Sequence, residues 1–132
     1  MTTFDQLVEI ANAMGCTVKF NKQIRNYFGQ YDKNTNSIIL SEHNLKTRQD
    51  KLITLSHEIG HAYYKHSISN SIIIAHCRDT VSSYQRYRLL KQEKDAWEYA
   101  IVLARWFGFY SKKFKREMEK SIACSREEFR RW

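Results

Sequence analysis

The chain has 132 residues, of which 42% are hydrophobic and 14% aromatic, and this suits one globular domain over residues 1–132 with its own core. Its three cysteines are far apart and odd in number, which argues against a disulfide framework and favours reduced thiols. There is no signal-like N-terminus and no apolar run long enough to span a bilayer, so we predict a cytoplasmic protein without membrane association. The formal net charge of +8 favours acidic partners such as nucleic acid, although a solvated basic surface is the more common explanation.

The N-terminal residues 3–14 predict an amphipathic helix. Their apolar side chains recur with helical period, and Thr3 and Gln6 have the spacing of a capping box. Gly15 is a suitable terminator. Nothing in this stretch indicates chemistry.

Three short runs after this helix predict strands. Residues 16–20 alternate as a strand does, and the runs 27–31 and 37–40 flank a polar turn, which is typical of a hairpin. We therefore expect a small antiparallel sheet of about three strands. The edge of such a sheet could hold an extended peptide by strand addition, but a sheet that only supports the core fits these residues equally well.

The segment that specifies chemistry reads H-E-x-x-H, with His57, Glu58 and His61 at the fixed positions. One helical turn brings residues four apart onto one face, so both imidazoles can bind one metal ion. Glu58, next to the first histidine, can act as general base on a water at that metal. A catalytic zinc usually takes three protein ligands, so one more is expected downstream. An amphipathic helix that carries this short pattern by chance is the alternative.

The surrounding residues favour a helix over about 46–66. Either Asn44 or Thr47 can cap it, and Gly60 lies in its interior. A glycine there costs about 1 kcal/mol relative to alanine, which suggests that another element packs very close to the metal-binding face. An apolar stripe runs beside the two histidines and consists of Leu52, Leu55, Ile59 and Ala62 or Tyr63.

The residues 67–80 have no clear period and predict a loop or a short irregular element. His66 and His76 are candidates for an extra ligand or a transition-state donor, but such histidines are more often surface or hydrogen-bonded residues. Cys77 follows His76 and could lie near a metal, although a free cysteine is usually a small buried hydrophobe.

A long helix over about 82–107 carries the candidates for the missing ligand, which are Glu93, Asp95 and Glu98. Small residues at Ala96 and Ala100 would let this helix lie against Gly60. Geometry then favours Glu93 or Glu98 over Asp95, and spacing alone does not choose between them.

The C-terminal segment 111–132 is basic and predicted to be helical, as two short helices. It holds eight Lys or Arg against four Glu, so half of the net charge of +8 lies there. Such a segment could contact nucleic acid weakly or dock on an acidic protein, but a solvated face is more common.

With these elements in order, the chain resembles the ImmA/IrrE family of zinc metallopeptidases over residues 25–105. Three stretches carry the likeness: F-G-Q-Y through S-I-I-L at 28–40, L-S-H-E-I-G-H at 55–61, and E-K-D-A-W-E-Y-A at 93–100. The last is similar to the family's E-x-x-A-x-x-F-A, whose first glutamate is the third zinc ligand. The resemblance therefore implies that Glu93 completes the site.

The resulting prediction is an α+β protein in which Zn²⁺ is held by His57, His61 and Glu93, with Glu58 as general base. The resemblance implies phage or mobile-element gene regulation, in which the enzyme cleaves a helix-turn-helix repressor. Two alternatives stay open: a zinc-containing regulator that binds a protein without cutting it, and a basic nucleic-acid-binding protein. The sequence does not indicate an oligomeric state. Candidates for a transition-state donor are Tyr63, Tyr64, His66, His76, Tyr84 and Tyr87.

Overall fold

The structure is a computed structural model that describes residues 1–66 and 83–130, with side chains described in 1–66 and 87–124. The predicted irregular segment at 67–80, with His76 and Cys77, lies outside the described residues, as does the side chain of Tyr84. The helices and strands are, in order, α1 (Thr3–Ala13), β1 (Thr17–Asn21), β2 (Gly29–Asp32), β3 (Ser37–Ser41), α2 (Arg48–Tyr63), α4 (Ser83–Trp106) and α5 (Lys112–Arg130). This arrangement confirms the predicted α+β class.

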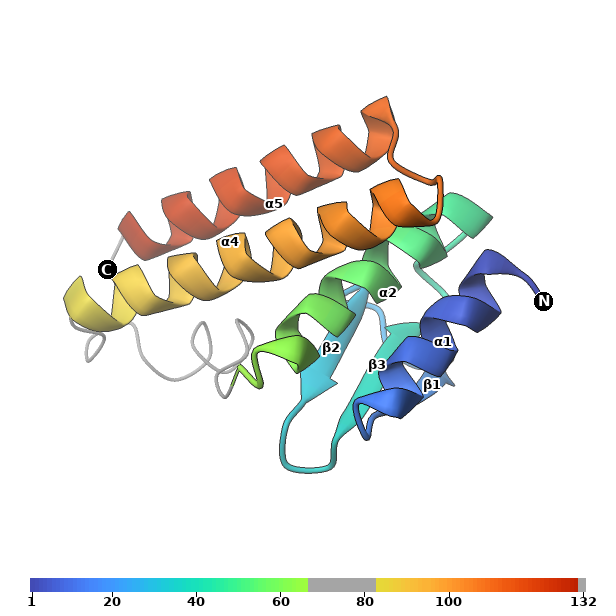
Figure 1. Ribbon diagram of the computed structural model, residues 1–132. Helices are drawn as coiled ribbons and strands as arrows, with labels where there is room; N and C mark the ends of the chain where they lie inside the picture. The colour runs from blue at the N-terminus through green and yellow to red at the C-terminus, as the bar shows by residue number, and fades with distance from the viewer. Residues whose placement is uncertain (67–82, 131–132) are drawn as a thin grey trace.

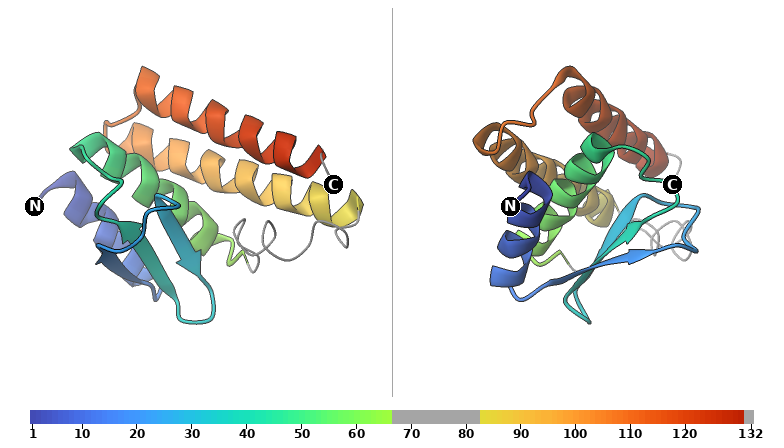
Figure 2. Two further views of the ribbon diagram at one scale, coloured as in Figure 1. Left: turned by 180° about the vertical axis from the view of Figure 1, so that it is seen from behind. Right: turned by 90° about the vertical axis from the view of Figure 1, so that its right-hand side faces the viewer.

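The elements stack in layers around α2 (Figure 1). The two further views show the sheet on one side of α2 and the α4–α5 pair on the other (Figure 2). The contacts agree, because α2 packs on α1, β2 and β3 on one side and on α4 on the other, while α5 packs on α4. The helix with the two histidines is therefore the central element of the fold.

The sheet is mixed, so the predicted antiparallel sheet is wrong for one of its strands. The strand order is β1-β3-β2, and β2 pairs antiparallel with β3 as the hairpin prediction requires. β1 pairs in parallel with β3, with Thr17 opposite Ser37. The physical reason is the apolar character of β3, whose Ile38 and Leu40 are fully buried. This strand takes the central position and is paired on both sides.

Side-chain caps explain where α1 and α2 begin. Thr2 Oγ1 accepts a hydrogen bond from the Asp5 N–H at 3.1 Å, and Asp5 accepts one from the Thr2 N–H at 3.2 Å. The capping box of α1 thus lies one residue before the predicted Thr3. In α2 the cap is Thr47, one of the two predicted alternatives, and Asp50 completes the reciprocal pair.

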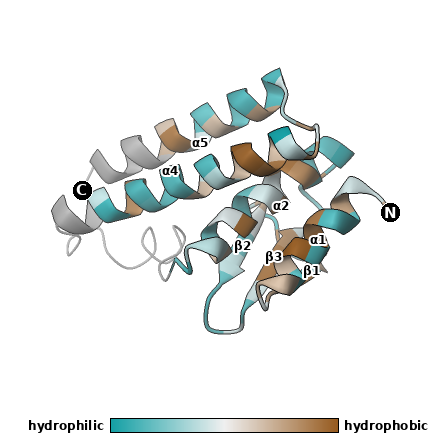
Figure 3. Cartoon of the chain, viewed as in Figure 1, coloured by the Kyte–Doolittle hydropathy of each residue, from teal (hydrophilic) through white to brown (hydrophobic). Residues whose placement is uncertain are grey.

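The C-terminal segment is one helix that packs into the core, and two short helices are not found. α5 runs from Lys112 to Arg130 without a break. Its Phe114 is fully buried, and Lys113 Nζ lies 2.6 Å from Asp50 Oδ1 of α2. Figure 3 shows hydrophobic residues on α1, β3 and the second half of α4, and these elements form the core together with the buried face of α2 and Phe114. No helix within the described ranges is long and apolar enough to cross a membrane.

At Gly60 two helices approach each other very closely, as its place in the sequence suggested. A Cβ atom built on Gly60 would lie 2.2 Å from the backbone oxygen of Ala96 in α4. Ala96 and Ala100 are themselves fully buried. Only a residue without a side chain lets α2 and α4 approach to this distance.

Replacing Gly60 by alanine should therefore destabilise the protein, because the added methyl group must push α4 away from α2. We expect Gly60→Ala to lower the free energy of unfolding by about 3 kcal/mol or more, a large overpacking cost. Gly108→Ala is the matched control, since Gly108 has a positive φ of 79° but no atom lies within 4 Å of the place that an added Cβ would take. That change should cost about 1 kcal/mol through backbone strain alone. Denaturant unfolding measures both, and equal losses would contradict the account.

Candidate metal centre

Two imidazoles of α2 and one carboxylate of α4 converge between these helices. His57 and His61 lie one turn apart in α2, and their Nε2 atoms each lie 3.0 Å from a different oxygen of Glu93. Among the described residues, these three form the cluster that could hold a metal ion, with ligand atoms all within 4.8 Å of one another. The side chains of both histidines and of Glu93 are largely shielded from solvent.

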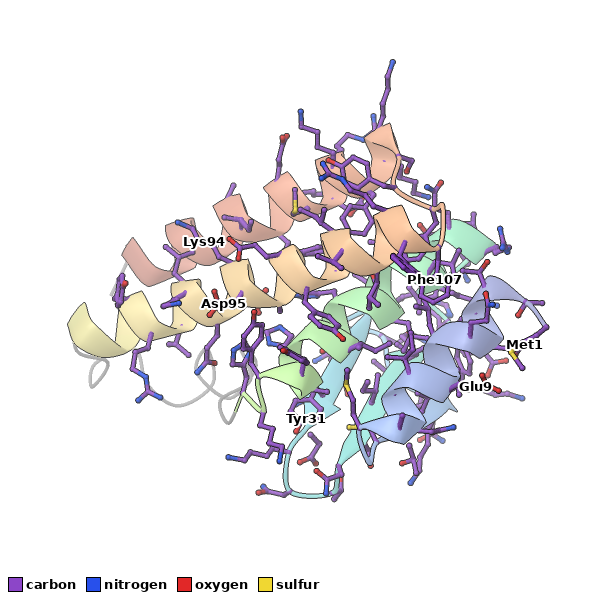
Figure 4. All side chains as sticks on the ribbon, in the orientation of Figure 1. Met1, Glu9, Tyr31, Lys94, Asp95 and Phe107 are labelled. Atoms are coloured by element: carbon purple, nitrogen blue, oxygen red, sulfur yellow. The ribbon has the colours of Figure 1, made fainter. Side chains whose placement is uncertain are left out.

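The structure brings only one of the three predicted carboxylates into this cluster. Glu93 is 4% exposed and faces α2. Asp95, labelled in Figure 4, is not one of the three clustered residues and pairs with Lys91, whose Nζ lies 3.2 Å from Asp95 Oδ2. Glu98 is exposed. Geometry therefore selects Glu93, the residue that the resemblance implied.

Opposite charges hold the centre together when it carries no metal. Burial lowers the pKa of His57, but the carboxylates of Glu93 and Glu58 outweigh that effect and raise this pKa to about 10. Burial raises the pKa of Glu93, but the two histidines outweigh it and hold the pKa well below its usual value. The metal-free arrangement is thus an ion pair of imidazolium and carboxylate, and a cation that replaces the proton meets an ionised carboxylate.

The donor set fits a zinc ion. Two imidazole nitrogens and one carboxylate oxygen are a ligand set of catalytic zinc sites, and ligands of a tetrahedral zinc lie about 3.4 Å apart. Each Nε2 lies 3.0 Å from one carboxylate oxygen, and the ligand atoms all lie within 4.8 Å of one another, so the same donors can surround one ion after a local adjustment. The fit concerns the chemistry of the donors, and the donors alone do not identify the metal.

Glu58, the predicted general base, is 6% exposed and lies beside His57. Its Oε2 is 3.3 Å from His57 Nδ1, the ring nitrogen that does not face Glu93. Glu58 also lines a cavity of about 550 Å³ between α2, the start of β2, α4 and α5. The carboxylate is therefore both a partner of a candidate metal-ligand ring and accessible to a molecule in this cavity.

The cavity is lined by apolar and by charged side chains. Its lining includes Phe28, Leu45 and Ile53, and the α5 residues Lys113, Glu117 and Lys120. The predicted solvated tail thus forms one wall of the space beside the site.

His66 lies behind the metal-binding ring of His61, a place that sequence reasoning did not identify. The Nδ1 atoms of His61 and His66 are 2.8 Å apart, which is hydrogen-bond distance. Lys65 has a positive φ of 52°, and the His66 N–H donates to the His61 carbonyl at 3.1 Å, so the chain turns back at the end of α2. Burial, reinforced by His61, lowers the pKa of His66 to about 4, which keeps this ring neutral. The left-handed backbone conformation of Lys65 cannot be predicted from the sequence, because lysine rarely adopts it, so the position of His66 could not be predicted either.

Trp97 is the second residue that sequence reasoning missed. Its indole stacks on the His57 imidazole with ring centroids 4.1 Å apart and planes 10° apart. The sequence did hold a signal, because Trp97 follows Glu93 by one helical turn and so lies on the same face of α4.

The tyrosines proposed as transition-state donors lie outside the cluster where they are described. Tyr63 is half exposed and stacks on Tyr99, with centroids 4.4 Å apart. Tyr64 stacks on His66, with centroids 5.4 Å apart. Tyr87 is 63% exposed. No donor is assigned from these positions.

Comparisons with known proteins add no identification, because no family model, no curated protein and no solved structure matches this chain.

His66 should orient His61 by accepting the proton of its Nδ1, and this leaves Nε2 for a metal. We expect His66→Ala to weaken zinc binding about tenfold, the lower range for loss of a partner of a metal ligand. His43→Ala is the matched control, because His43 is exposed and far from the cluster in the sequence. Competition with a chromophoric chelator measures both affinities. Equal affinities of the two variants would rule out this role.

Proposed function

We propose that the protein is a zinc-dependent endopeptidase. The observation that carries the proposal is the convergence of His57, His61 and Glu93 from two helices into one shielded cluster, with Glu58 next to it. The H-E-x-x-H spacing supports it independently, since this pattern combines two ligands with a base.

When bound, zinc supplies a Lewis acid that polarises water and a peptide carbonyl. The work of the chain is to hold that ion and to move the proton. Glu58 accepts the proton of the attacking water and delivers it to the leaving amine, which is the role of a general base that becomes a general acid. Its place in the wall of the cavity gives it access to a substrate there.

An extended peptide is the substrate shape that the surroundings favour. β2 is paired only with β3 among the described strands, so its other edge has free backbone groups. Gly29, the first residue of β2, lines the cavity beside Glu58. A peptide added to this edge would run past the candidate base. The repressor substrate is proposed from the resemblance in the sequence alone.

The first test is the metal content of the protein purified without a histidine tag and without added metal. We expect about one zinc per chain in the wild type, in Asp95→Ala and in Glu98→Ala, because neither of the last two residues belongs to the cluster of candidate ligands. Glu93→Ala should lose most of the metal, since it leaves two ligands. Equal zinc in all three variants would contradict the assignment of Glu93, and a wild type that takes up no zinc would contradict the metal site.

The second test separates an enzyme from a regulator that binds without cutting. Glu58→Gln should retain zinc but lower cleavage of a peptide library by about 10²- to 10⁴-fold, because the amide cannot accept the proton. Mass spectrometry of the products measures cleavage by the zinc-loaded wild type and variant. Cleavage by Glu58→Gln at the wild-type rate would overturn the mechanism. A zinc-loaded wild type that cuts no peptide would favour the non-cleaving regulator.

A further inference from the structure

Helix α5 reaches the candidate metal centre through one side chain of α4. Trp97 is 4% exposed and lies between the two, with His57 on one side and α5 on the other. Neither the H-E-x-x-H pattern nor the third ligand requires such a residue.

The indole limits how the His57 ring can turn. The planes of the two rings are nearly parallel, at 10°, and their centroids are 4.1 Å apart, so one face of the imidazole is covered. Rotation of the imidazole about its Cβ–Cγ bond would drive its edge into the indole. The edges of the ring are engaged as well, by Glu58 at Nδ1 and Glu93 at Nε2. The covered face therefore fixes the direction in which Nε2 points.

Two residues of α5 fix the indole in turn. The Trp97 Nε1–H donates a hydrogen bond to Ser121 Oγ at 3.2 Å. This bond fixes the orientation of the indole, because it directs the N–H edge of the ring towards α5. Phe114 packs against the indole edge-on, with centroids 5.6 Å and planes 90° apart. Phe114 is itself fully buried, so this support is rigid.

We infer that Trp97 is a positioning residue for His57 and that Ser121, through Trp97, makes α5 a working part of the metal centre. A ring that is already oriented loses less conformational freedom when it binds a metal, so its affinity is higher. The inference rests on the proposed metal site. It also gives the basic C-terminal helix a role that does not depend on its charge.

The experiment measures zinc affinity by chelator competition, and the absorption spectrum of the Co²⁺-loaded protein, well below the melting temperature of each metal-free variant. Trp97→Leu should lose about 10- to 100-fold in zinc affinity, as partners of metal ligands do. Ser121→Ala should lose about fivefold, the value of one hydrogen bond, and Ser121→Thr, which keeps the hydroxyl acceptor, should bind like the wild type. Trp106→Leu is the matched control, since Trp106 is in the same helix but 83% exposed.

The outcomes separate this inference from the proposed function and from a merely structural role. Loss of affinity and a changed Co²⁺ spectrum in Trp97→Leu and Ser121→Ala, with recovery in Ser121→Thr, would support it. If these variants melt at lower temperature but bind zinc like the wild type, Trp97 only fills space and the inference is wrong. If Trp97→Leu does not fold, the comparison of zinc affinity between Ser121→Ala and Ser121→Thr tests the inference without it. A wild type that binds no zinc overturns both the metal site and the inference.

Discussion

The contact between Gly60 and the backbone of Ala96 is the constraint on which the rest of the structure depends. The backbone oxygen of Ala96 occupies the space of a missing side chain, which brings the backbones of α2 and α4 into direct contact. Gly60 directly precedes His61, and Ala96 lies about one turn after Glu93, so the same contact brings the two histidines within reach of that carboxylate. A side chain at position 60 would separate the helices and with them the three candidate ligands.

The same close packing buries carboxylates, whose negative charge must be compensated. Glu58 and Glu93 are 6% and 4% exposed, and an ionised carboxylate at such a depth is costly unless an opposite charge compensates it. In the metal-free protein the compensation comes from His57, whose pKa the two carboxylates raise to about 10. A divalent cation bound by His57, His61 and Glu93 would compensate the negative charge of the carboxylates with more positive charge than one imidazolium carries. The close packing of α2 on α4 thus both buries these carboxylates and brings together the side chains that could hold a metal ion.

Much of the fold and of the candidate site could be predicted from local patterns. The period of α2 and α4, a cap at Asn44 or Thr47 and the H-E-x-x-H spacing depend on residues close in sequence. The parallel pairing of β1 with β3 could not be predicted, because it depends on which strand enters the middle of the sheet after β2 has formed a hairpin with β3. The hydrophobic character of β3 explains this choice only after the pairing is known.

The residues around the candidate metal centre, Trp97 and its contacts in α5, could not be predicted from the sequence for a related reason. Trp97 was not singled out, because the ring it contacts comes from a different helix. The basic composition of α5 suggested a solvated face, while its buried Phe114 and its hydroxyl at Ser121 contact Trp97. Charge counts describe what a helix shows to solvent, and the packing of α5 is decided by its other face. The contact with Trp97 belongs to that face, whereas the α5 wall of the cavity also includes charged residues.

The claim that the α2–α4 contact assembles a zinc site from His57, His61 and Glu93 is tested most directly by X-ray absorption at the zinc edge. The protein would carry less than one equivalent of zinc, so that the strongest site is the one observed. The account predicts a shell of nitrogen and oxygen only, at about 2.0–2.1 Å, with the outer-shell scattering of two imidazoles, and a changed shell in Glu93→Ala. Sulfur in the shell, the absence of imidazole scattering, or an identical spectrum in Glu93→Ala would contradict it.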